Sequence, residues 1–154
     1  TEKVDDEYVK SPRKWETRSI KSFMAYMGPL SSVFDVLCFA VMWWIIGANT
    51  IELSPMFQCG WFVFGTVSQV LVIHMIRTAK IPFLQSRPSA SLIVSTLVVA
   101  AVAFIIGFSS LAIGIDMMPL PTSFIPWLML ILAGYFIFAQ LVKKIYVSRY
   151  GEWL

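Results

Sequence analysis

The chain has 154 residues, of which 58% are hydrophobic and only 14% are charged. This apolar excess is far above that of a soluble domain, so the composition predicts an integral membrane protein. The net charge of +3 comes without a basic helix carrying interleaved aromatic residues, which argues against nucleic-acid binding. The sequence also lacks a phosphate-binding glycine-rich loop, an HExxH motif and a nucleophile elbow. We therefore expect no phosphoryl transfer or hydrolysis by this chain alone.

Residues 1–25 form a charged lead-in, in which an acidic cluster precedes a basic run. Ser11 and Pro12 could open a helix that lies in the membrane interface before the chain turns inward. A solvated lead-in fits the same residues equally well. Because the chain starts at Thr1 with this segment and not with a signal peptide, we expect a piece of a longer chain. The apolar stripe of the candidate helix is Trp15, Ile20, Phe23 and Met24.

Four apolar segments are each long enough to cross a hydrocarbon core of about 30 Å. Short polar links separate them, which favours antiparallel neighbours. Proline is tolerated in the first turn of a helix, so Pro126 fits the start of the fourth segment. The predicted fold is an all-α membrane protein with four transmembrane helices in an antiparallel bundle. The predicted spans are about 26–48, 57–76, 91–110 and 125–143, within a membrane domain of 26–143 followed by an interfacial tail of 144–154.

Positive charges occupy alternate segments of this layout. Of the twelve lysines and arginines, half precede the first span, and the rest divide between the loop 77–91 and the C-terminal tail. The links 49–56 and 109–123 contain none. Cytoplasmic loops are enriched in lysine and arginine, so this pattern predicts that both termini and the middle loop lie in the cytoplasm.

Asp35 is the only acidic residue inside a predicted span. A carboxylate near mid-depth costs about 2.5–3.5 kcal/mol on insertion scales, so we expect it to face other helices or a polar cavity. Ser31 and Ser32 lie one turn away, and Ser32 with Gly28 would permit a close helix contact. Asp35 could be an oxygen ligand or gate on a path for a hard cation such as Mg²⁺. It could equally be a structural lock that bonds to a serine or a neighbouring helix.

Other polar residues give weaker indications. Gln69 follows Gly65 by one turn, which favours a close helix approach with an interhelical hydrogen bond over ion coordination. His74, the only histidine, is expected to be a hydrogen-bonded residue at the interface and not a ligand. Glu52 and Asp116 fall in the short links, where we expect ordinary solvation. The two cysteines lack CxxC spacing, so neither a disulfide framework nor a structural metal site is expected.

Five strings, taken together, carry a family resemblance across essentially the whole chain. They are KSPRKWE, MGPLSSVFDV, FQCGWFVFGTVSQVLVIHMIRTAKIPF, PLPTSFIPW and KKIYVSRYGEWL. In this order they resemble the C-terminal third of MgtA-type magnesium-importing P-type ATPases.

The resemblance implies that the four spans are helices seven to ten of a ten-helix translocase in the bacterial inner membrane. Helices one to six of the same pump would then be its partners, together with the lipid bilayer. Mg²⁺ would be the transported ion, and the upstream domains would bind ATP and Mg²⁺ and carry the phosphorylated aspartate, leaving no cofactor here.

Asp35 would lie on helix seven, and Gln69 on helix eight, about where related calcium pumps place a liganding carboxylate. The implied role is a static support for the moving helices. An autonomous four-helix channel or scaffold protein is the alternative reading.

Overall fold

The computed structural model describes residues 17–78, 80–82 and 86–150. Within those residues the only regular structure is helical, which confirms the predicted all-α class. The helices are α2 (Thr17–Ala40), the π-helix η1 (Val41–Ile45), α3 (Ser54–Ile76), α4 (Ala90–Gly107), the 3₁₀-helix η2 (Ser110–Ile115) and α5 (Phe124–Tyr150). Four segments are long and apolar enough to cross a membrane, namely Lys21–Ile45, Ser54–Ile76, Ala90–Gly107 and Phe124–Arg149.

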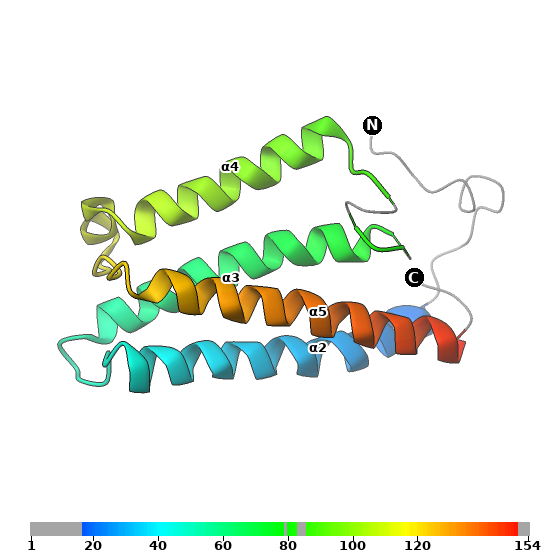
Figure 1. Cartoon of the computed structure of the whole chain (residues 1–154), viewed down its shortest axis with the longest axis horizontal. Coiled ribbons are helices and arrows are strands. Elements are labelled where there is room, and N and C mark those ends of the chain that lie inside the picture. Colours follow the sequence, from blue (N-terminus) through cyan, green and yellow to red (C-terminus); the bar gives the residue numbers. More distant parts are fainter. Residues whose placement is uncertain (1–16, 79, 83–85, 151–154) are drawn as a thin grey trace.

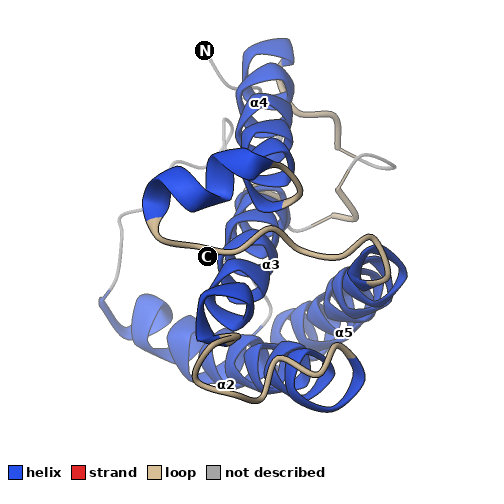
Figure 2. Cartoon of the chain, turned by 90° about the vertical axis from the view of Figure 1, so that its left-hand side faces the viewer, coloured by secondary structure: helices blue, strands red, loops and turns tan. Residues whose placement is uncertain are grey.

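The four long helices alternate in direction along the chain, as the short links predict (Figure 1). They do not form a closed bundle. α3 contacts α2, α4 and α5, and α2 packs along α5, whereas α4 stands to one side of the other three (Figure 2). Lipid tails are as apolar as leucine, so no hydrophobic force draws an apolar helix into the centre.

α4 approaches α3 through its small residues. Its buried residues are Thr96, Ala103 and Gly107, and such residues allow helix backbones to come close together. A Cβ atom placed on Gly107 would lie 2.3 Å from Cγ2 of Val63 on α3, so this position requires glycine. The outward face of α4 is made of large apolar side chains: Val94, Leu97, Val98, Val102 and Ile105.

Hydrogen bonds to backbone carbonyls show which loops lie at the same end of the molecule. The N–H of Met118 donates to the carbonyl of Pro55 at 3.4 Å, and the N–H of Leu120 donates to Gly107 at 2.8 Å. At the other end, the Lys143 ammonium donates to the carbonyl of Met75 at 2.8 Å. The two cation-free links therefore lie opposite the C-terminal end of α5, in agreement with the alternation of charge along the sequence.

Local chemistry explains where the helices begin. Pro55 lies in the first turn of α3, where its missing N–H would have no helical partner in any case. Pro126 occupies the equivalent part of α5, which begins at Phe124. The Ser89 hydroxyl accepts the N–H of Leu92 at 3.3 Å and so caps the start of α4.

α2 differs from the expected lead-in. It runs without interruption from Thr17 to Ala40, so Phe23 and Met24 belong to the same helix as Asp35 and not to a separate interfacial helix. The proposed start of that helix at Ser11 and Pro12, like Trp15, lies outside the described residues. The first turns of α2 are held by α5, because Arg149 donates to the Tyr26 hydroxyl at 3.3 Å.

Candidate cation site

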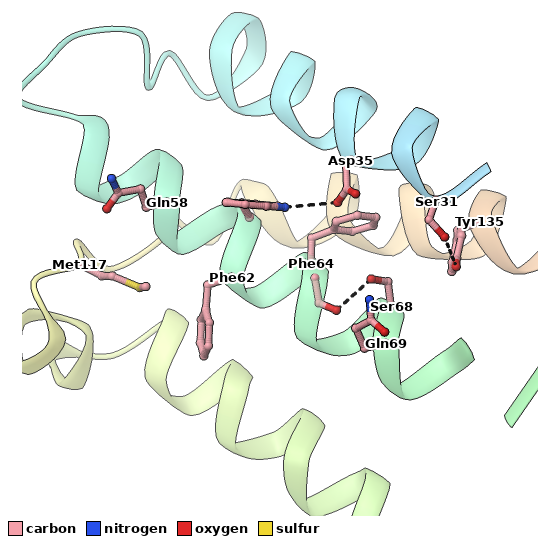
Figure 3. Close-up of a pocket in the computed structure, with 11 residues that line it drawn as sticks. Ser31, Asp35, Gln58, Phe62, Phe64, Ser68, Gln69, Met117 and Tyr135 are labelled. Carbon is pink, nitrogen blue, oxygen red and sulfur yellow. Dashed lines mark hydrogen bonds between the residues drawn. The ribbon is translucent and has the colours of Figure 1, made fainter. Parts of the chain in front are cut away.

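A cavity of about 570 Å³ opens between α2, α3 and α5. Met117, from the link between η2 and α5, also borders it (Figure 3). The surface of its wall is mostly apolar, but polar side chains from three helices also face it. The polar lining residues are Ser31 and Asp35 of α2, Gln58, Trp61, Ser68 and Gln69 of α3, and Tyr135 of α5.

Asp35 is half-buried and faces this cavity. The indole Nε1–H of Trp61 donates to Oδ1 of Asp35 across 3.3 Å (Figure 3). No lysine, arginine or histidine among the described residues forms an ion pair with this carboxylate. Asp35 therefore lies against α3 at the wall of this cavity, and its charge has no basic partner among the described residues.

Ser31, on α2, lines the cavity and contacts Tyr135 of α5. Its Oγ lies 2.9 Å from the hydroxyl of Tyr135, and Tyr135 is only 1% exposed. Phe34 packs edge-on against the Tyr135 ring, with centroids 5.4 Å apart. Sequence reasoning missed both Tyr135 and Trp61, because an aromatic residue in an apolar span reads as core or interface. The only signal in the sequence was that each side chain carries a polar group, the indole N–H of Trp61 and the hydroxyl of Tyr135, which needs a partner inside a membrane.

Ser32 does not line the cavity. Its hydroxyl is exposed and donates to the carbonyl of Gly28 in its own helix at 3.2 Å. A Cβ atom on Gly28 would meet nothing within 4 Å. No described helix makes the close contact that this pair would permit.

Gln69 reaches the cavity from α3 and is exposed there. The interhelical hydrogen bond predicted for it is not made, because no described residue bonds to its amide. A Cβ atom on Gly65 also meets nothing within 4 Å, so the expected close approach at Gly65 is replaced by open cavity. The neighbouring Ser68 hydroxyl donates to the carbonyl of Gly65 at 2.9 Å.

The remaining polar candidates lie elsewhere. His74 is 3% exposed, and its Nε2 lies 3.0 Å from Oγ1 of Thr96 on α4, which matches the expectation of a hydrogen-bonded residue. Glu52 and Asp116 are exposed in the links. The backbone N–H of Glu52 itself and the Thr50 hydroxyl both stabilise the Glu52 carboxylate and lower its pKa.

The described residues contain no group of three or more His, Cys, Asp or Glu side chains that could hold a metal ion. The cavity therefore offers one carboxylate with neutral oxygen donors around it. Such a donor set suits a hard cation that keeps most of its water.

The sequence itself defines the class of protein. Residues 1–145 match the family described as "Cation transporting ATPase, C-terminus", and the chain belongs to this family. It is 43% identical over 152 residues to the "Magnesium-transporting ATPase, P-type 1" of Salmonella typhimurium strain LT2, covering 99% of this chain and 17% of that protein. It is 47% identical over 148 residues to the protein of the same name from Escherichia coli K12, covering 96% of this chain and 16% of that protein.

Proposed function

We propose that this chain is the C-terminal membrane part of an ATP-driven pump that imports Mg²⁺, and that its cavity lies on or beside the ion's route. The uncompensated Asp35 carboxylate facing that cavity carries the proposal. A charge at mid-depth of a membrane helix is costly, and an ionisable residue there is a functional candidate by default. The relatives' names supply the ion, and ATP would be bound by parts of the pump outside this chain.

In the proposed site Asp35 supplies the charge, and Ser31 and Gln69 supply neutral oxygens. Mg²⁺ gives up its water reluctantly and is commonly held by one or two carboxylates while it retains several waters. Six waters occupy about 180 Å³ at the density of liquid water. A cavity of about 570 Å³ therefore has room for a hydrated ion. Ser32, which bonds to its own helix, is left out of this site.

The proposed placement is multi-pass in the inner membrane of a bacterium. The charge pattern puts both termini and the loop 77–91 in the cytoplasm by the positive-inside rule. The four helices then act as a support for the upstream helices of the same pump. Contacts of α3 with α2, α4 and α5 favour this role, since one central helix ties the other three together.

A structural lock is the competing role for Asp35, and the bond to Trp61 is what favours it. Both roles can be tested with Asp35→Asn in the full-length protein, which keeps the size of the side chain and removes its charge. We expect the Mg²⁺ concentration for half-maximal ATP hydrolysis to rise about tenfold or more, from the loss of a charged ligand worth roughly 1.5–3 kcal/mol. Thermal unfolding should change little.

A lower unfolding temperature with unchanged Mg²⁺ dependence would instead show that Asp35 is a structural lock. Wild-type values in both measurements would remove both roles. A membrane-facing substitution, Val36→Ala, serves as the control for nonspecific effects on α2, since Val36 is 61% exposed.

A further inference from the structure

We propose that Trp61 is a positioning residue that orients the Asp35 carboxylate toward the cation, an inference that rests on the proposed function. α2 holds the indole of Trp61 at two points. Oδ1 of Asp35 accepts the Nε1–H at 3.3 Å, and Phe39, one turn further along α2, packs edge-on against the indole with centroids 5.6 Å apart. The indole, which is 50% exposed, is therefore held beside the carboxylate by two contacts with α2.

The chemistry of the indole donor explains how Trp61 can orient the Asp35 carboxylate. An indole has one N–H donor, no acceptor and no charge. It can hold one oxygen of a carboxylate in place without neutralising it, whereas a lysine or arginine would pair with the charge. Within the described chain no other group bonds to the Asp35 carboxylate, so Oδ2 remains available to an ion or its water shell.

The position of Trp61 along α3 supports the same role. It lies one turn after Gln58 and two turns before Gln69, and all three residues line the cavity. Figure 3 shows Gln58 and Gln69 on opposite sides of Asp35 along α3. A carboxylate that rotated freely would point into different parts of the cavity. The bond from Trp61 favours the orientations in which Oδ1 stays beside the indole N–H.

The test uses Trp61→Phe in the full-length pump, because phenylalanine keeps an aromatic ring beside Phe39 and lacks the N–H. The Mg²⁺ concentration for half-maximal ATP hydrolysis should rise about 3- to 10-fold, as expected for one hydrogen bond. The maximal rate should stay within about twofold, because the bond acts on ion binding. Trp44→Phe is the matched control, since Trp44 is 77% exposed and should leave both values unchanged.

A double-variant cycle separates positioning from simple packing. In a protein that already carries Asp35→Asn, adding Trp61→Phe should change the Mg²⁺ dependence no further, because the oriented charge is gone. Effects that multiply would overturn the positioning role, and so would a Trp61→Phe protein with wild-type Mg²⁺ dependence. If Asp35→Asn alone has no effect on Mg²⁺ dependence, the proposed function of the site fails instead.

A spectroscopic measurement covers the case in which Trp61→Phe does not fold. In full-length protein labelled with ¹⁵N-tryptophan, Mg²⁺ should shift an indole N–H resonance of the wild type and not of Asp35→Asn. Identical indole spectra for these two proteins at all Mg²⁺ concentrations would contradict the proposal.

Discussion

Asp35 carries a negative charge near the middle of a membrane-length helix, and no described cation neutralises it. The groups around it are neutral: the indole of Trp61 bonds to it, and the Ser31–Tyr135 pair lies one turn away. In a medium of low polarity, neutral donors orient a carboxylate while its attraction for a cation persists. The side chains are therefore arranged to keep the charge available.

Ser31 and Ser32 provide a matched pair for testing this arrangement. Ser31→Ala leaves the nearly buried Tyr135 hydroxyl without its 2.9 Å partner, so it should destabilise the full-length protein by about 1 kcal/mol. Ser32→Ala removes only an exposed bond to the carbonyl of Gly28 and should be neutral. Thermal unfolding of both variants in detergent checks this, and equal unfolding temperatures would contradict the assigned contacts.

The sequence identified Asp35, Ser31 and Gln69 as candidates, because polar groups within apolar spans are conspicuous. It could not identify their partners. Trp61 is 26 residues from Asp35 along the chain, and Tyr135 is 104 residues from Ser31. Such pairs depend on how the helices rotate and pack. For the same reason, the sequence could not show that Ser32 points along its own helix.

α3 contacts α2, α4 and α5, and its C-terminal end is tied to α5. Lys143 is 4% exposed, and its Nζ donates to the carbonyls of Met75 and Lys80 at 2.8 and 3.0 Å. The last carbonyls of a helix carry partial negative charge, which favours a cation at that end. Lys143 thus joins two helices and stabilises the end of one.

Lys143→Met should therefore loosen the contact between α3 and α5. The methionine keeps the apolar stem but leaves those carbonyls without a charged donor, at a cost of about 1.5–3 kcal/mol. Lys144→Met is the control, since Lys144 is exposed and should matter little. Thermal unfolding of the full-length variants measures the difference. A Lys143→Met protein as stable as the control would show that the hydrogen bonds of Lys143 do not contribute to stability.

Length and hydropathy were sufficient to predict the four helices, since an apolar run of membrane length has few other structures available. Their packing was not predictable from the same information. α4 is apolar on all sides, so its pattern does not reveal which face meets α3. The continuation of α2 back to Thr17, ahead of the predicted span, was missed because the charged residues there suggested a separate segment.

Considered together, the helices leave a cavity with polar groups between α2, α3 and α5, while α4 presents an almost wholly apolar outer face. Polar groups are costly against lipid, so we expect the cavity to be covered by other parts of the proposed pump or filled with water. The chain spans only about one-sixth of the length of its relatives. The surface around the cavity is therefore proposed both to border the ion route and to contact the upstream helices.

Chemical modification of Gly65→Cys in the full-length protein tests the proposed ion route most directly. Gly65 lines the cavity and has open space where a side chain would lie, while the native Cys38 and Cys59 are fully buried. Gly28→Cys, at a position that is equally open but outside the cavity, is the control. We predict that Mg²⁺ slows the reaction of Gly65→Cys with a charged thiol reagent and does not affect Gly28→Cys. An unchanged rate at Gly65→Cys, at Mg²⁺ concentrations that drive ATP hydrolysis, would contradict the account.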